Sequence, residues 1–145
     1  MEQGVTLKEI IEKMNLKNLT PELDLDGRSI DVPDINRPAL QLTGFFEHFE
    51  SNRVQIIGHV EHTYLQTLTN ERKSEIFDLL LSHQIPCIVL CRDLPASDIM
   101  IEKAYRYNIP VFQTSMQTSS FMAEIIRWLN VKLAPCITIH GVLVD

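Results

Sequence analysis

Cys87-Ile-Val-Leu-Cys91 is an unbroken apolar run of strand length, and it decides the class of fold. Two similar runs cover residues 54–57 and 110–112. Continuous rather than alternating apolar residues are typical of strands buried on both faces, as in parallel sheets covered by helices. We therefore expect an α/β fold with a mainly parallel or mixed central sheet and helices on both faces.

The segments around these runs have the apolar spacing of helices. This spacing predicts helices over residues 61–68, 70–82, 97–107 and 118–132. The last of them has an apolar stripe that includes Phe121, Ile125 and Leu129, and Thr118 or Ser119 is placed to cap it.

The amino-terminal region predicts smaller elements. Thr6-Leu-Lys-Glu9 has the spacing of a capping box, which predicts a helix over residues 6–14. Asp26-Gly27 is a favoured two-residue hairpin turn, with strands expected nearby over residues 16–19 and 28–32. Residues 34–49 predict an irregular loop with a short helix after Gly44, docked on the core through Phe45, Phe46 and Phe49.

Length and charge limit the class of protein. The chain has 145 residues, close to the commonest domain size, and its 13 basic and 19 acidic residues give a net charge of −6. This charge repels nucleic acid, so we expect proteins or small molecules as partners. No apolar run approaches the roughly 18 residues of a spanning helix. Charges throughout the first 15 residues argue against a signal peptide, so we expect a cytoplasmic protein with no membrane partner.

Cysteine spacing argues against a disulfide in the central strand. Cys87 and Cys91 lie four residues apart, which puts their Cα atoms about 13 Å apart in a strand, beyond the roughly 7 Å limit for a disulfide. We expect both to be buried small hydrophobic residues.

Glycine and histidine spacing excludes several kinds of site. The five glycines, at positions 4, 27, 44, 58 and 141, have neither P-loop nor dinucleotide-binding spacing. We therefore expect no kinase or dehydrogenase activity and no bound cofactor from this chain alone. His59 and His62 flank Glu61, but no second pair completes a tetrahedral site, so no metal site is predicted.

A candidate ligand crevice lies at the carboxyl ends of the predicted parallel strands, where such sheets bind ligands and helix N-termini attract anions. Its candidate residues are Arg92, Thr114, Ser115, Thr118 and Ser119. In the alternative interpretation, these hydroxyl groups only cap the last helix.

The stretch Leu133-Ala-Pro-Cys-Ile-Thr-Ile-His140-Gly-Val-Leu-Val-Asp145 reads as a strand that leads away from the preceding helix. A buried strand needs neighbours. We therefore expect residues 1–132 to be an amino-terminal domain and residues 133–145 to be the first strand of a second domain.

Four blocks follow one another in order along the chain: Asp34-Ile-Asn-Arg-Pro-Ala-Leu-Gln-Leu-Thr-Gly-Phe-Phe46, Arg53-Val-Gln-Ile-Ile-Gly58, Pro86-Cys-Ile-Val-Leu-Cys-Arg-Asp-Leu94, and Leu133-Ala-Pro135 with His140-Gly-Val-Leu-Val-Asp145. Together they resemble bacterial HPr kinase/phosphorylases over the whole length of the chain, and the last block is the most specific.

The resemblance implies a bifunctional enzyme of the sugar phosphotransferase system. Such enzymes phosphorylate a serine of the protein HPr with ATP or pyrophosphate and Mg²⁺, remove that phosphate by phosphorolysis, and so control carbon catabolite repression. It also implies a hexamer, a P-loop kinase domain after this chain, and an amino-terminal domain similar to the first domain of Mur ligases. The active-site histidine of the family matches His140.

Two functions remain open from the sequence. The first is a regulatory or assembly domain of an HPr kinase/phosphorylase, inactive in isolation. The second is a ligand-binding sensor module that takes a phosphorylated metabolite or nucleotide at the crevice of Arg92.

Overall fold

The computed structural model describes residues 4–134. Within them the centre is a five-stranded sheet in the order β2-β7-β6-β5-β4. The strands are β2 (Lys17–Asn18), β4 (Ile35–Asn36), β5 (Val54–Ile57), β6 (Ile88–Leu90) and β7 (Val111–Gln113). Strands β4 to β7 are parallel, and β2 is antiparallel to β7. The predicted α/β fold with a mainly parallel, mixed sheet is therefore confirmed.

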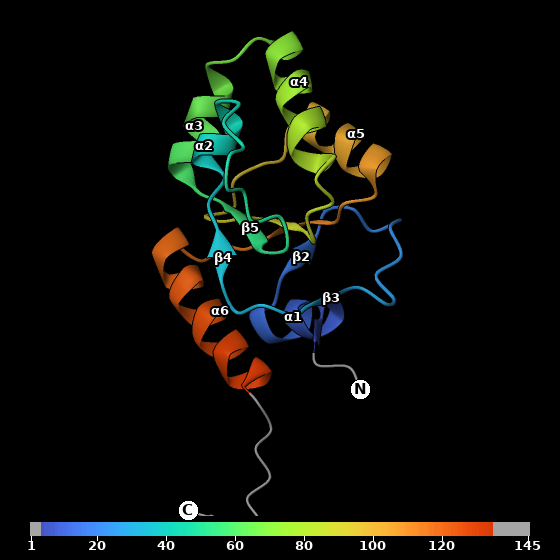
Figure 1. Cartoon of the computed structure of the whole chain (residues 1–145), viewed down its shortest axis with the longest axis vertical. Coiled ribbons are helices and arrows are strands. Elements are labelled where there is room, and N and C mark those ends of the chain that lie inside the picture. Colours follow the sequence, from blue (N-terminus) through green and yellow to red (C-terminus); the bar gives the residue numbers. More distant parts are fainter. Residues whose placement is uncertain (1–3, 135–145) are drawn as a thin grey trace, which may run out of the picture.

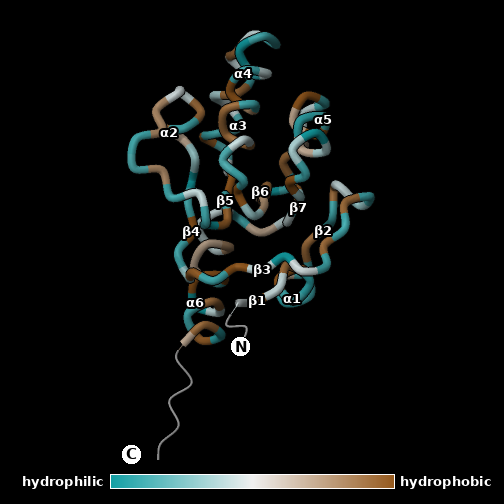
Figure 2. The backbone as a smooth tube through the Cα atoms, turned by 45° about the vertical axis from the view of Figure 1, so that its right-hand side comes forward, coloured by the Kyte–Doolittle hydropathy of each residue, from teal (hydrophilic) through white to brown (hydrophobic). Residues whose placement is uncertain are grey.

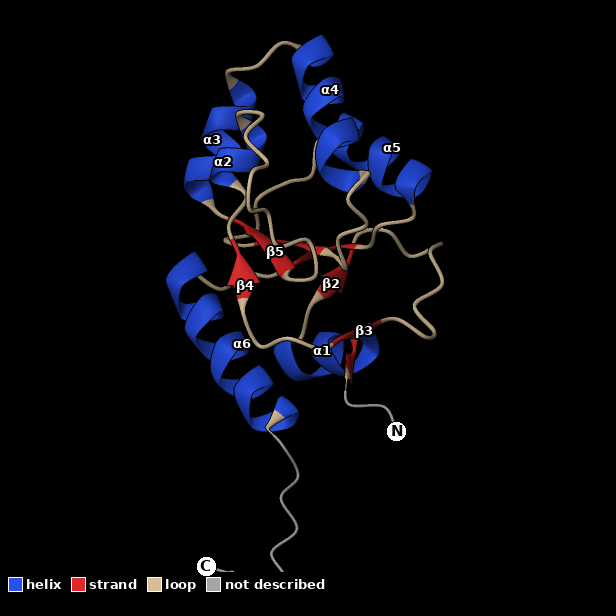
Figure 3. Ribbon diagram, in the orientation of Figure 1, coloured by secondary structure: helices blue, strands red, loops and turns tan. Residues whose placement is uncertain are grey.

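Helices cover both faces of this sheet (Figures 1 and 3). One face carries α2 (Ala39–Leu42), α3 (His59–Gln66), α4 (Asn70–Leu81) and α5 (Asp98–Tyr107). The other carries α1 (Leu7–Met14), α6 (Thr118–Leu133) and a small ribbon of β1 (Val5–Thr6) and β3 (Ser29–Ile30). Right-handed crossovers between parallel strands that add in one direction put all the connecting helices on one face. This explains why α2 to α5 lie together.

The central strands bury side chains on both faces, as their continuous apolar sequence requires. In β6, Ile88 and Leu90 face the α2–α5 side, whereas Val89 faces α1 and α6. Cys87 and Cys91 flank β6 on the α1 and α6 side, where both are fully buried and free, as predicted. In Figure 2 the tube of α6 changes between brown and teal along its length, because only one side of this helix faces the core.

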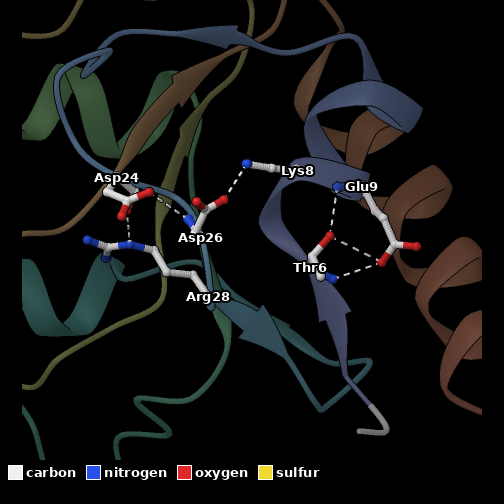
Figure 4. Close-up of polar contacts among 6 residues, drawn as sticks. All are labelled: Thr6, Lys8, Glu9, Asp24, Asp26 and Arg28. Atoms are coloured by element: carbon white, nitrogen blue, oxygen red, sulfur yellow. Dashed lines mark hydrogen bonds and ion pairs between the residues drawn. The ribbon is translucent and has the colours of Figure 1, made fainter.

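The predicted capping box begins α1 (Figure 4). Thr6 Oγ1 accepts the Glu9 N–H at 3.1 Å, and Glu9 Oε1 accepts the Thr6 N–H at 2.9 Å. The helix ends at Met14, and its C-cap residue, Asn15, adopts a left-handed conformation with φ 55°. Lys8 on the exposed side pairs with Asp26. The helices α3 to α6 also lie within a few residues of their predicted bounds.

The predicted hairpin at Asp26-Gly27 is wrong, although the chain does turn there. β2 pairs with β7 and β3 pairs with β1, so the two expected strands are never neighbours. The turn is held locally: the Asp24 carboxylate accepts the Asp26 N–H at 3.0 Å, and the Arg28 guanidinium donates to the Asp24 carbonyl at 2.7 Å (Figure 4). The pairing of β2 with β7 and of β3 with β1 therefore prevails over the local hairpin preference.

The region of residues 34–49 also differs from its prediction. It contains the edge strand β4 and the short helix α2, which precedes Gly44 instead of following it. Gly44 has φ +100°, a conformation that ends helices. Phe46 and Phe49 pack around His83, with ring centroids 4.7 and 5.2 Å from the His83 ring. Phe45 is 47% exposed, so two of the three phenylalanines dock.

None of the helices formed by residues 4–134 has the length and apolar character needed to cross a membrane. The helix α6 ends at Leu133. The rest of the predicted outgoing strand, with His140, lies outside the described residues.

Candidate functional site

A pocket of about 240 Å³ lies at the carboxyl edge of the parallel strands. Its walls come from the segments that follow four successive strands. They are formed by Arg37, His59, Val60, Arg92, Gln117, Thr118 and Ser119. The structure thus contains a pocket at the edge where the strand pattern predicted one.

The course of the chain explains why the pocket lies beside β5. Helix α3 follows β5 directly, whereas α6 follows β7, passes to the opposite face of the sheet and contacts β5 there. The carboxyl end of β5 is therefore flanked by the N-termini of two helices. Helix N-termini carry unpaired amide groups and a partial positive charge.

An ion pair joins Arg37, which lines the pocket, to Glu61, which does not. Glu61 is 3% exposed, and its Oε1 accepts one hydrogen bond from Arg37 Nη2 at 2.8 Å and another from the Gly58 N–H at 2.9 Å. Arg37 directly follows β4, and Gly58 directly follows β5. The buried carboxylate therefore ties the ends of two neighbouring strands together and caps α3.

Gly58 lets these groups approach one another. A Cβ atom at this position would lie 2.5 Å from Thr118 Oγ1 and 2.8 Å from Arg37 Nη2. Such distances are far below van der Waals contact, so a side chain at position 58 would push α6 or Arg37 away. The absence of a side chain brings α3, α6 and β4 together.

The prediction that Thr118 or Ser119 caps α6 is wrong. The N-cap residue is Gln117, and no side chain caps the helix. Thr118 is the first helical residue, and its side chain is turned toward Gly58 instead of the end of the helix. It is 8% exposed, and Thr118 Oγ1 has no hydrogen bond within residues 4–134 that meets normal geometric limits.

The Cys91 thiol lies beside this hydroxyl group. Burial raises the pKa of Cys91 to about 11, while the Thr118 hydroxyl and the charge of Arg37 act to lower it. A thiol is only a weak hydrogen-bond partner, so Cys91 does not satisfy the Thr118 hydroxyl in the way an oxygen acceptor would.

Arg92 reaches the pocket from a tight turn after β6. Arg92 and Asp93 both have left-handed conformations, with φ 60° and 54°. The turn is fixed to the segment after β7, because the Arg92 N–H donates to the Met116 carbonyl and the Asp93 N–H to the Thr114 carbonyl, each at 2.9 Å. The backbone of this turn is therefore firmly placed, and the exposed Arg92 side chain lines the pocket.

The structure brings together three of the five residues predicted for the crevice, namely Arg92, Thr118 and Ser119. Thr114 and Ser115 are not among its walls. Thr114 is 5% exposed, and its hydroxyl accepts the Met116 N–H at 3.2 Å, so it shapes the loop.

Sequence reasoning missed Arg37, His59 and Gln117. The position of Arg37 depends on β4, which was not predicted, although Ile35-Asn-Arg37 before Pro38 has the form of a strand end.

Within residues 4–134, no three His, Cys, Asp or Glu side chains gather as metal ligands. Glu61, between His59 and His62, instead turns inward to Arg37.

Comparison with known proteins identifies relatives. A family model described as the HPr serine kinase N terminus matches residues 5–129. The chain is 55% identical over 141 residues to the HPr kinase/phosphorylase of Lachnoclostridium phytofermentans, covering 97% of this chain and 46% of that protein. It is 42% identical over 142 residues to that of Peptoclostridium acidaminophilum, covering 95% and 46%. The chain therefore spans about half the length of these relatives.

A solved structure shares the fold. The regulatory region of Clostridium perfringens pyrophosphatase, with CBS and DRTGG domains and the activator diadenosine tetraphosphate, aligns with a TM-score of 0.59 and 18% identity. The alignment covers 88% of this chain and 48% of that one. It supports the α/β architecture, and the expected similarity to the first domain of Mur ligases stays a prediction.

Proposed function

The chain belongs to the HPr serine kinase N-terminus family, and from this premise we propose that it is the amino-terminal domain of an HPr kinase/phosphorylase. The observation that carries the proposal is a 55% identity that extends over 97% of the chain but only 46% of the relative. A whole-chain match of this kind supports a domain that works as part of a longer enzyme. It favours this function over an independent sensor module.

In this proposal the longer enzyme phosphorylates a serine of HPr with ATP or pyrophosphate and Mg²⁺, and it removes the phosphate by phosphorolysis. The present chain supplies regulation and assembly and is inactive alone, because its glycines have no P-loop spacing. His140 belongs to the catalytic part, where it lies near the transferring phosphate or the HPr serine and stabilises the developing charge.

The surface of the domain supports a role in assembly. Leu40 on α2 and Val60 on α3 are 60% and 65% exposed, and Phe45 nearby in the chain is 47% exposed. Leu40 and Val60 line a pocket of about 280 Å³ that includes Leu42 and Tyr64. Apolar side chains gathered on a surface are typical of contacts between proteins. We assign this surface to contact with the kinase part of the longer enzyme, in a homo-oligomer of the hexameric kind that the resemblance implies.

The test compares three proteins: the 145-residue chain, the full-length enzyme, and the full-length enzyme without residues 1–132. Phosphorylation of HPr with ATP and with pyrophosphate, phosphorolysis of phosphorylated HPr, and mass in solution are measured for each. We expect both reactions in the full-length enzyme, neither in the 145-residue chain, and altered assembly or regulation after the deletion. Phosphorylation of HPr by the 145-residue chain would contradict the proposal.

A further inference from the structure

A second pocket, of about 400 Å³, lies at the amino edge of the central sheet, opposite the edge that holds Arg92. Asn52, Gln84 and Asn108 line it from the three segments that lead into β5, β6 and β7, and residues 27–31 around β3 line it from the other side. We propose that this pocket binds a neutral molecule with several hydroxyl groups, of the size of a monosaccharide. Its volume is in the range of small-molecule sites.

The charge of the lining favours a neutral ligand. Arg28 is the basic side chain of the pocket wall and Asp31 is the acidic one, so the two charges cancel. All other lining residues are neutral. An anion would meet the Asp31 carboxylate and a cation would meet the Arg28 guanidinium, whereas a neutral polar molecule can hydrogen-bond to both without an uncompensated charge.

Three carboxamide side chains supply the hydrogen-bonding groups. Asn52, Gln84 and Asn108 are exposed where they line the pocket. Within residues 4–134 the side chains of Asn52 and Gln84 form no hydrogen bond with other residues, and that of Asn108 forms one, through Oδ1. A carboxamide carries a donor and an acceptor side by side. Each hydroxyl group of a polyol also donates and accepts, so carboxamides from three directions match a ring of hydroxyl groups.

Arg28 is held in place before any ligand binds. Its Nε donates to the Asp24 carbonyl at 2.7 Å (Figure 4), its Nη1 to the Asn108 carbonyl at 2.8 Å, and its Nη2 to Asn108 Oδ1 at 2.6 Å. These bonds use three of the five guanidinium hydrogens. They also fix the Asn108 amide, because Oδ1 accepts and the NH₂ group is left as a donor. A ligand therefore meets groups whose ordering cost is already met by the fold.

The backbone at Gln84 gives an independent observation. Gln84 follows α4 and has a left-handed conformation with φ 59°. Glycine or asparagine adopts this conformation at lower cost than glutamine. Backbone outliers of this kind gather at binding sites, where the side chain that they position is needed. The fold thus accepts a less favourable residue at a position where its carboxamide lines the pocket.

The experiment titrates the 145-residue chain with D-glucose, D-fructose and D-mannitol and records ¹H–¹⁵N NMR spectra. Side-chain NH₂ groups give signals of their own, so the response of Asn52, Gln84 and Asn108 is observed directly. We expect saturable shifts of these three signals with at least one of the compounds. Asn130, an exposed amide on α6, is the internal control and should not shift. Melting temperature is not the readout, because sugars stabilise proteins generally by exclusion from their surface.

Three variants locate the site. Gln84→Gly removes a carboxamide where glycine suits the backbone, so it should weaken binding about three- to tenfold without lowering the melting temperature. Asn52→Ala changes an exposed residue and should weaken binding by a similar factor. Asn130→Ala removes an amide outside the pocket and should bind like the parent chain.

Three results would overturn the proposal. One is the absence of a saturable shift of the pocket amides with all three compounds. Another is unchanged affinity in both Gln84→Gly and Asn52→Ala. The third is much tighter binding of glucose 6-phosphate than of glucose, which would make the pocket an anion site. Because HPr and nucleotides are absent from these measurements, failure here is distinct from failure of the proposed kinase association.

Discussion

Glu61 and Arg37 form an almost buried ion pair, with Glu61 Oε1 2.8 Å from Arg37 Nη2, between the start of α3 and the end of β4. Glu61 is 3% exposed and Arg37 is 34% exposed. Removing one partner of such a pair leaves the other charge without compensation, which costs more than the intact pair contributes. The pair therefore holds the carboxyl edge of the sheet together.

Arg37→Ala should lower the free energy of unfolding by about 2 kcal/mol, less than for a fully buried pair because Arg37 is partly exposed. Urea unfolding would measure the change. Arg53→Ala is the matched control, since Arg53 lies 3.9 Å from an Asp34 carboxylate that is 66% exposed. It should cost under about 0.5 kcal/mol. Equal losses in the two variants would contradict the role given to Arg37.

Gly58→Ala should destabilise the fold by about 2–3 kcal/mol, because the added methyl group would overlap Thr118 and Arg37. Thr118→Ala in the same chain removes both Thr118 atoms that crowd this position. The double variant should therefore recover at least about 1 kcal/mol relative to the sum of the single losses. A double-mutant cycle of urea unfolding measures this coupling, and strict additivity would mean that the two sites do not meet.

Asp78→Asn should destabilise the chain at neutral pH by about 2 kcal/mol, because Lys103 is 6% exposed and its ammonium group lies 2.9 Å from Asp78 Oδ1. The hydrogen bond from Lys103 is the main cause that lowers the pKa of Asp78 below its ordinary value of 3.8. The stabilisation is therefore complete above about pH 5 and is lost as the pH falls below 3.8 through the folded-state pKa.

The measurement is thermal unfolding of both proteins between about pH 2.5 and 7, the range in which the Asp78 carboxylate loses its charge. The difference in melting temperature between parent and variant should shrink on the acidic side. Glu75→Gln changes an exposed carboxylate on the same helix and serves as the control. A difference that is constant with pH would exclude the Asp78 carboxylate as its source.

Thr6→Ala should lower the free energy of unfolding by about 1 kcal/mol, the usual effect of losing an N-cap hydroxyl. Thr6 Oγ1 accepts the Glu9 N–H, so that amide loses its partner. Glu12→Ala changes an exposed residue of the same helix and should have little effect. Chemical denaturation of the three proteins distinguishes a cap from a general loss of helix propensity.

Cys87 and Cys91 should resist thiol reagents in the folded chain. Both are fully buried, and burial raises the pKa of Cys87 to about 12 and that of Cys91 to about 11. Little reactive thiolate therefore exists at neutral pH. Iodoacetamide labelling followed by peptide mapping should modify these two cysteines in guanidinium chloride but not in buffer. Rapid labelling of Cys91 in the native protein would contradict its burial in the core.

The sequence was sufficient for the interior of the fold. Strands such as β6 bury both faces, which leaves a continuous apolar run, and helices such as α6 bury one stripe. The strands at the two edges of the sheet leave no such pattern in the sequence. A strand was predicted at the position of β2 but with the wrong partner, and β4 was not predicted; both have only two residues, and their pairing is decided by contacts distant in the chain.

The same contrast between interior elements and edge strands decides which residues of the candidate site could be predicted. Arg92 could be placed from the sequence because it directly follows a predicted strand. Arg37 could not be placed, because the two-residue strand β4 before it leaves no recognisable pattern in the sequence. Thr118 was placed at the crevice, but its predicted alternative role as the cap of α6 is wrong, although a threonine at the start of a helix often caps it. Only the structure shows that Gly58 leaves room for its side chain to turn inward.

The two-residue strands at both edges of the sheet have a further consequence. An exposed strand edge is a template on which another chain can add by backbone pairing, and such addition leads to aggregation. Here both borders, β2 and β4, are very short, and Pro38 follows β4 closely without an N–H to donate. Copies that come close together would therefore meet through side chains, which disfavours uncontrolled polymerisation.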